Sequence, residues 1–155
     1  MDAAHCVYGA FLGVLWCVQC LFVKTPSGRQ RLHVLAALNA TARATFTGQH
    51  LTSVTAATVC ELLRRLAGAH PGQLLTIVLD QARYQRCTLV QEVARSVGIA
   101  LLFVPPYSPN LNLIERWWTC VQKQGLYGKY SPDSAAFQPA IVDCIAQAGT
   151  KHQAA

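Results

Sequence analysis

Two apolar runs and the segment between them form the clearest pattern in the chain. Residues 74–80 (LLTIVLD) and 99–104 (IALLFV) are almost continuously apolar, as is typical of parallel strands that are covered on both faces. Between them, apolar residues recur at helical spacing and predict a helix from about 84 to 96. Strand, helix and strand over about thirty residues predict a βαβ unit with a right-handed crossover.

The part of the chain before this unit carries strand and turn signals. Residues 18–24 (VQCLFVK) and 31–39 (RLHVLAALN) flank the turn sequence TPSG at 25–28, and this arrangement predicts a hairpin. A third strand is predicted near 42–47, and a helix is predicted from Thr52 onward, where apolar residues recur at three- and four-residue steps. Antiparallel strands followed by parallel strands predict an α/β fold, in which a mixed sheet carries helices on its faces.

Residues 105–118 (PPYSPNLNLIERWW) join a proline-rich loop to an amphipathic helix that is predicted from about 111 to 124. On a helical wheel, Asn112 and Glu115 lie on the polar face. The opposite face is apolar and is formed by Leu113, Ile114, Trp117, Trp118, Cys120 and Val121, with Leu111 at its edge. Because proline restricts the backbone, the loop fixes where the helix begins and therefore where Glu115 is held.

Composition narrows the class of protein. With 155 residues, of which 52% are hydrophobic and only 13% charged, the chain has enough apolar material for one domain with a core and does not have the composition of a disordered protein. The net charge of +6 and the pI of about 9.1 favour an anionic partner, above all nucleic acid. The seven cysteines are an odd number, which favours a reducing compartment.

Residues 6–23 (CVYGAFLGVLWCVQCLFV) allow a different hypothesis. The segment carries one polar side chain, Gln19, and is followed by Lys24, so hydropathy alone makes it a candidate membrane helix or signal anchor. No positively charged region precedes it, and two glycines interrupt it. A small membrane-anchored protein is therefore an alternative that rests on this segment alone.

The scarce acidic residues suggest a site. Asp80 closes the apolar run 74–80, and ligands of open α/β sheets collect at the carboxyl ends of strands. Asp2 would lie beside it if residues 2–7 form a neighbouring strand. Together with Glu115, these carboxylates could hold hard divalent cations through oxygen, and paired cations stabilise both oxygens of a phosphodiester displacement. Structural roles, with Glu115 as a helix-capping or ion-paired residue and Asp80 as a strand terminus, are the alternative.

Three stretches carry a resemblance to a known family: residues 28–39 (GRQRLHVLAALN), 79–86 (LDQARYQR) and 105–118. They resemble the catalytic domain of DDE transposases, in particular the bacterial insertion-sequence branch of the mariner superfamily, which is similar to retroviral integrases. Asp80 and Glu115 have 34 residues between them, the spacing that marks this superfamily. The resemblance implies a ribonuclease-H-like mixed five-stranded sheet with flanking helices.

The same resemblance implies roles for individual residues. Asp2, Asp80 and Glu115 would be the catalytic residues and would bind two Mg²⁺ or Mn²⁺ ions, with Asn112 and His5 supporting them. The reaction would be DNA cleavage at the ends of an insertion sequence and strand transfer into target DNA. Our own candidates for contacts with the DNA backbone are the cationic residues Arg83, Arg116, Lys123 and Lys129.

The resemblance also sets the expected domain organisation. It implies a catalytic domain at 1–145 and a C-terminal tail at 146–155. Only Met1 precedes Asp2, so the first strand is expected to be truncated at its N-terminus. The family's helix-turn-helix region is absent from this sequence. We therefore expect either a partner frame that supplies it or a catalytically inactive remnant that still binds DNA, and a homodimer is left open.

Within this fold, residues 6–23 are the end of the first strand, a connector and the second strand. A membrane-spanning helix would remove that segment from the sheet. The resemblance therefore implies a protein that does not enter a membrane, located in the bacterial cytoplasm and associated with the nucleoid.

Overall fold

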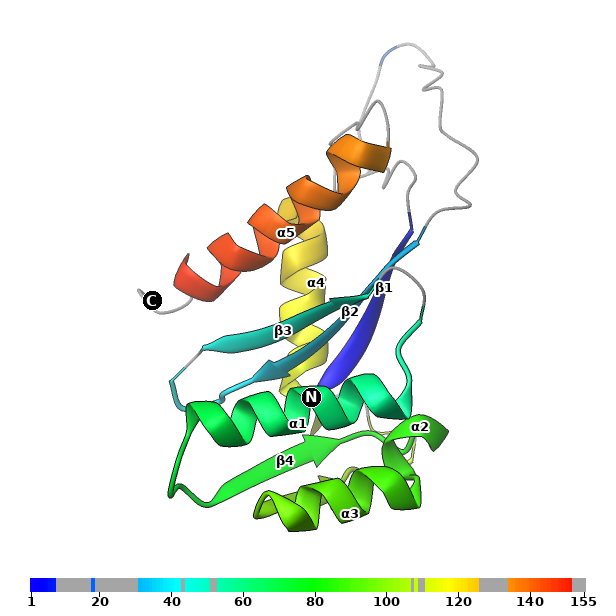
Figure 1. Cartoon of the computed structure of the whole chain (residues 1–155). Coiled ribbons are helices and arrows are strands. Elements are labelled where there is room, and N and C mark those ends of the chain that lie inside the picture. Colours follow the sequence, from blue (N-terminus) through cyan, green and yellow to red (C-terminus); the bar gives the residue numbers. More distant parts are fainter. Residues whose placement is uncertain are drawn as a thin grey trace.

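The computed structural model describes residues 1–7, 18, 31–42, 44–50, 53–106, 108, 111–125 and 134–151. These residues form a mixed α/β arrangement (Figure 1), with the strands β1 (Asp2–Val7), β2 (Arg31–Leu38), β3 (Thr45–His50), β4 (Leu75–Leu79) and β5 (Ile99–Phe103). The helices are α1 (Ala56–Ala69), α2 (Arg83–Arg86), α3 (Thr88–Ser96), α4 (Leu113–Gly125) and α5 (Ser134–Lys151).

The five strands form two hydrogen-bonded groups. β1, β2 and β3 form an antiparallel sheet in that order, and β4 pairs in parallel with β5. The N-terminal ammonium of Met1 donates a 2.7 Å hydrogen bond to the carbonyl oxygen of Val78, which brings the start of β1 to β4. The mixed arrangement is thus confirmed. The ladder is not continuous between β1 and β4, because the two strands belong to separate hydrogen-bonded groups and Met1 lies just before β1.

The prediction that residues 18–24 pair with 31–39 in a hairpin is wrong, because β2 has other partners. β2 pairs with β1 on one edge, with His33 opposite His5, and with β3 on its other edge, with His33 opposite His50. Both edges are therefore occupied by strands far from residue 20. Apart from Val18, residues 18–24 lie outside the described part of the chain.

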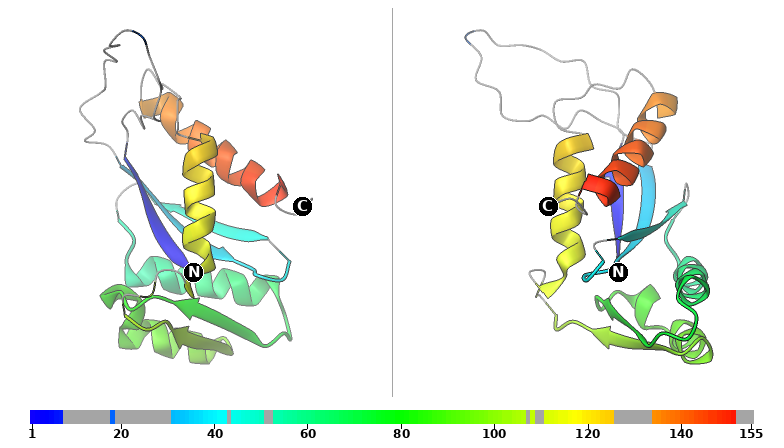
Figure 2. Two further views of the ribbon diagram at one scale, coloured as in Figure 1. Left: turned by 180° about the vertical axis from the view of Figure 1, so that it is seen from behind. Right: turned by 90° about the vertical axis from the view of Figure 1, so that its left-hand side faces the viewer.

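The hydrophobic core consists of two clusters on opposite faces of β1 and β2. Figure 2 shows α4 and α5 on one face and α1 on the other. Ala4 and Cys6 of β1 belong to the cluster with α4 and α5, whereas Ala3 packs against the cluster that α1, α3 and β4 complete. Side chains alternate along a strand, so Asp2 lies on the α4 face of β1.

α4 packs through a narrower stripe than the sequence predicts. Ile114, Trp117, Trp118 and Val121 are buried at positions i, i+3, i+4 and i+7. Leu113 and Leu111, which were assigned to the apolar face and its edge, are 51% and 58% exposed. Leu113 is the first residue of α4 and lies about 40° round the helix from Trp117, at the border of the stripe rather than at its centre.

The predicted helix 84–96 is two helices, because the backbone of Cys87 is extended (ψ 156°) and ends α2 before α3 begins. α5 was not predicted at all. It crosses the expected boundary between a domain at 1–145 and a tail at 146–155, and its Ala148 is buried in the core.

None of the helices in the described ranges is long and apolar enough to cross a membrane. Cys6 and Val7 form the end of β1, whereas residues 8–17 and 19–23 of the candidate membrane segment lie outside those ranges.

Candidate active site

The second and third predicted acids line the same pocket. Asp80 follows the last residue of β4, and Glu115 lies in the first turn of α4. The pocket has a volume of about 290 Å³ and is lined by Asp80, Gln81, Ala82, Val104, Pro105, Pro106, Ser108, Asn112 and Glu115. The folded chain therefore brings together two carboxylates with 34 residues between them, and the predicted proline loop forms part of the wall.

Asp2 lies within electrostatic reach of both acids. The pKa of its carboxyl is raised from 3.8 to about 6, mainly by burial and in smaller part by the negative charges of Asp80 and Glu115, while a hydrogen bond from the backbone of Ala3 and the charge of the Met1 ammonium lower it. Burial also raises the pKa of the Tyr84 hydroxyl, and Asp2 and Asp80 add to that effect. Asp2, Asp80 and Tyr84 are therefore neighbours on the β4 side of the site.

The acids do not form a closed set of metal ligands. Among the described residues, no group of three or more His, Cys, Asp or Glu side chains is placed so that it could hold a metal ion. The chemistry of the donors nevertheless fits a hard divalent cation, because carboxylate oxygens are its preferred ligands. A cation would also offset the repulsion from Asp80 and Glu115 that adds to the effect of burial on the pKa of Asp2.

Local hydrogen bonds hold Asp80 in place. Its Oδ1 atom accepts a 2.7 Å hydrogen bond from the backbone N–H of Ala82, an arrangement in which an aspartate side chain closes a turn. The neighbouring Gln81 donates from Nε2 to the carbonyl oxygen of Val104 at 3.0 Å and accepts from Arg86 at 3.3 Å. The turn after β4 is thereby tied to the segment that leads into the proline loop.

The start of α4 holds Glu115. The backbone N–H of Glu115 donates a 3.1 Å hydrogen bond to the carbonyl oxygen of Asn112, and a carboxylate in the first turn of a helix interacts favourably with the helix dipole. Asn112 is 5% exposed, and its Nδ2 atom has no hydrogen-bond partner. Asn112 thus brings an unpaired donor to the pocket that contains both acids.

The structure does not bring His5 to the acids. His5 lies three residues after Asp2 on β1 and therefore on the opposite face of the strand. Its Nδ1 atom is 2.6 Å from Nδ1 of His33 on β2. The sequence shows that His5 is near Asp2 along the chain, but only the strand conformation shows that the two side chains point apart.

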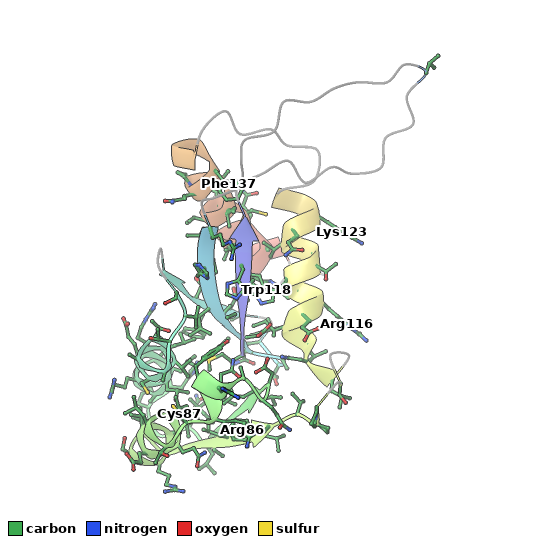
Figure 3. All side chains as sticks on the ribbon, turned by 90° about the vertical axis from the view of Figure 1, so that its right-hand side faces the viewer. Arg86, Cys87, Arg116, Trp118, Lys123 and Phe137 are labelled. Atoms are coloured by element: carbon green, nitrogen blue, oxygen red, sulfur yellow. The ribbon has the colours of Figure 1, made fainter. Side chains whose placement is uncertain are left out.

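Three of the four predicted DNA-contacting cations are exposed. Arg116 and Lys123 project from α4 on its solvent side (Figure 3), and Arg83 is exposed on α2. Arg116 and Lys123 are seven residues apart, or about two helical turns, so they lie on one side of the helix. Lys129 lies outside the described residues.

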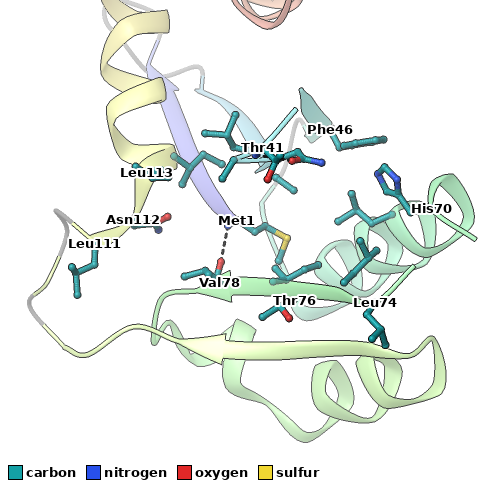
Figure 4. A pocket seen from close by; sticks show the side chains of 18 residues that line it. Met1, Thr41, Phe46, His70, Leu74, Thr76, Val78, Leu111, Asn112 and Leu113 are labelled. Carbon is teal, nitrogen blue, oxygen red and sulfur yellow. Dashed lines mark hydrogen bonds between the residues drawn. The ribbon is translucent and has the colours of Figure 1, made fainter. Parts of the chain in front are cut away.

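A larger pocket lies beside this site and is mainly apolar. Its volume is about 390 Å³, and it runs along β4 between Met1, the end of β2 and the start of α4 (Figure 4). Asn112 lines both pockets. None of the three acids lines the larger one, so cavity size alone would not have located them.

Sequence reasoning did not anticipate the hydrogen bond between Gln81 and Val104 or the place of Ser108 in the pocket wall. The position of Ser108 within the proline loop was the available signal. No local pattern marks the bond of Gln81, because its partner lies 23 residues away.

Residues 19–138 match the family described as DDE superfamily endonuclease, a range that includes Asp80 and Glu115 and begins after Asp2. No curated protein matches the sequence.

Solved structures match the fold at low sequence identity. The Mos1 transposase paired-end complex with the left transposon end has a TM-score of 0.69 at 12% identity, over 98% of this chain and 51% of that chain. The Mos1 strand transfer complex has a TM-score of 0.65 at 12% identity, over 96% and 53%. The intasome of simian T-cell lymphotropic virus, in complex with the PP2A regulatory subunit B56 gamma, has a TM-score of 0.51 at 20% identity, over 72% and 41%.

These likenesses confirm the ribonuclease-H-like fold shared by transposase and integrase catalytic domains. The chain spans about half the length of the Mos1 transposase chains that it matches.

Proposed function

The chain belongs to the DDE superfamily endonucleases, and from this premise we propose that it is the catalytic domain of a transposase. Its substrates are the DNA ends of a mobile element and a target DNA. We assign that element to the bacterial insertion sequences of the mariner superfamily. This assignment rests on the sequence PPYSPNLNLIERWW and on the 34 residues between Asp80 and Glu115.

The observation that carries the proposal is the shared pocket of Asp80 and Glu115, with Asp2 in electrostatic reach of both. Asp2, Asp80 and Glu115 are the residues that would hold two Mg²⁺ or Mn²⁺ ions. When bound, such ions stabilise the attacking and leaving oxygens of a phosphodiester displacement. The backbone N–H of Ala82 holds one oxygen of Asp80, a residue that lines the pocket.

Exposed cations support DNA as the partner. The net charge is +6, and Arg116 follows Glu115 directly in α4, with Lys123 two turns further on. Arg83 lies on α2, three residues after Asp80. Contacts of such side chains with phosphates would position a DNA strand without reading its sequence. The Mos1 structures with this fold are a complex with a transposon end and a strand transfer complex, and they support DNA ends as substrates.

The test uses the whole chain and pre-cut duplexes copied from the DNA that flanks its reading frame. We expect strand joining that requires Mg²⁺ or Mn²⁺ and that falls roughly 100-fold or more in Asp80→Asn and in Glu115→Gln, the scale on which loss of one electrostatic stabiliser acts. The matched controls are Glu92→Gln on α3 and Asp143→Asn on α5, which are exposed carboxylates outside the pocket.

A DNA-binding protein without catalytic activity is the second candidate. It is favoured by the net charge of +6 and by the absence of a closed metal-ligand group among the described residues. It predicts binding that weakens steeply with salt and shows little sequence preference. Joining activity that depends on Asp80 and Glu115 would exclude this candidate, whereas salt-sensitive binding without any joining would favour it over the first.

A further inference from the structure

Two histidines lie directly opposite each other in the antiparallel sheet. In the strand register, His5 of β1 lies opposite His33 of β2. Residues directly opposite each other in antiparallel strands place their side chains on the same face. The pair therefore lies on one face of the sheet, and it is the face opposite to that of Asp2.

The side chains of His5 and His33 are already in contact. The Nδ1 atoms of His5 and His33 are 2.6 Å apart, and their rings meet edge-on with centroids 4.7 Å apart. Two ring nitrogens at this distance can share only one proton, so at least one of them presents a lone pair. His5 is exposed and His33 is half-buried, so an ion in solution can reach the pair.

The electrostatic surroundings favour neutral imidazole at His33. Burial lowers its pKa, and the neighbouring His5 and the Arg31 guanidinium lower it further. A neutral ring is the form that binds a metal ion. Arg31 lies two residues before His33 on the same face of β2 and will itself repel a cation. It is exposed, however, so water screens its charge.

The spacing also suits a metal ion. A zinc–nitrogen bond is about 2.0–2.1 Å long, so two nitrogens on a tetrahedral ion are about 3.3 Å apart. The Nδ1 atoms would have to separate by roughly 0.7 Å from their present contact. Rotation of two surface rings achieves this without movement of the strands, since terminal ring torsions are broad.

We propose that His5 and His33 form a binding site for a divalent transition-metal ion of the zinc, nickel and copper group. Imidazole nitrogen prefers these ions, whereas Mg²⁺ prefers oxygen. The site is therefore separate from the acidic pocket in both place and chemistry, and it does not depend on the proposed transposase activity.

The test is a calorimetric titration of the whole chain with ZnCl₂, carried out in the Asp80→Asn, Glu115→Gln background so that the acidic pocket does not contribute. We expect one zinc ion per chain and no comparable binding of MgCl₂. His5→Asn or His33→Asn should weaken zinc binding roughly tenfold or more, since loss of even an outer partner of a metal ligand has effects of this size.

The matched control is His70→Asn. His70 lies at the end of α1, where its ring contacts Phe46 at a centroid distance of 5.4 Å, and its replacement should leave zinc affinity unchanged. Circular dichroism of each variant checks that it is folded. Zinc binding that is absent from the parent, or equal in the parent and in folded His5→Asn and His33→Asn, would overturn the proposal, because thiols or other groups would then be the ligands.

Discussion

The side-chain amide of Gln81 donates a 3.0 Å hydrogen bond to the carbonyl oxygen of Val104. Gln81 is the residue after Asp80, and Val104 is the residue before the proline loop that leads to Glu115. The bond therefore connects the two backbone segments from which the paired acids project. It adds to the backbone bond from Val104 to Leu79, which measures 2.9 Å.

Gln81→Ala should lower the rate of metal-dependent strand joining beyond what its effect on the free energy of unfolding explains. A single hydrogen bond contributes about 0.5–1.5 kcal/mol, so we expect a loss of rate of roughly 2- to 10-fold. The control is Gln91→Ala, which removes a 2.8 Å bond to the carbonyl oxygen of Arg86, away from the pocket. Single-turnover kinetics and urea unfolding measure both quantities. Equal rates in the two variants would show that the bond does not position the acids.

The raised pKa of Asp2 predicts a pH-dependent stability in the absence of divalent metal. The pKa is 3.8 in the ordinary state and about 6 in the fold, so the folded protein binds more protons between these values. The free energy of unfolding contributed by Asp2 is therefore fully present below about pH 4 and is lost as the pH rises to about 6.

Asp2→Asn should remove this loss. We expect the variant to match the wild type near pH 4 and to be more stable at pH 7.5 by on the order of 1–2 kcal/mol, a value reduced because Asp2 is only partly buried. Urea unfolding in a chelating buffer measures the difference, and the exposed Asp143→Asn serves as the control. Burial also lowers the pKa of the Met1 ammonium to about 6, but this group is present in both proteins. A difference that does not change with pH would contradict the raised pKa.

Neighbouring residues of α4 should differ sharply in their contribution to stability. Ile114 is 1% exposed and packs against Trp117 and Ile141, whereas Leu113 is 51% exposed. Ile114→Ala should cost about 2–5 kcal/mol, because it leaves a cavity in the core. Leu113→Ala should cost less than about 1 kcal/mol. Chemical denaturation measures both, and similar costs would show that α4 does not dock through the stripe that includes Ile114.

Some elements follow from local patterns. The apolar runs 74–80 and 99–104 became β4 and β5 almost residue for residue, since short continuous apolar runs favour strands. The predicted cover on both faces is wrong for β5, where Ala100 and Leu102 are exposed. The helix carrying Glu115 was found for a related reason, because the prolines before it and the apolar residues within it mark both its start and its period.

Other elements depend on bonds that no local pattern reveals. The third strand begins at Thr45, later than the predicted 42–47, because Asn39 organises the turn before it. The Oδ1 atom of Asn39 accepts hydrogen bonds from Thr41 and Ala42, and its N–H donates to Ala44. The break at Cys87 is similar, since Gln91 binds the carbonyl oxygen of Arg86 that the interrupted helix leaves free.

α5 was missed although a signal was present. Phe137, Ile141, Cys144, Ile145 and Ala148 recur at helical spacing and are all buried. Pro139 lies inside the helix, and proline is a strong argument against helix when only the sequence is known. The pairing of His5 with His33 could not be predicted in any case, because it depends on the register between strands 28 residues apart.

The hydrogen bond from Met1 to Val78 has a consequence for the three acids. This bond joins the residue before β1 to β4. Because β1 and β4 share no continuous ladder, side-chain packing governs how Asp2 is aligned with Asp80. A cation held by acids from both sides would therefore join β1 to β4 across this junction. The melting temperature would then rise with the concentration of the cation. The protein with bound cation would resist unfolding more than the protein without it.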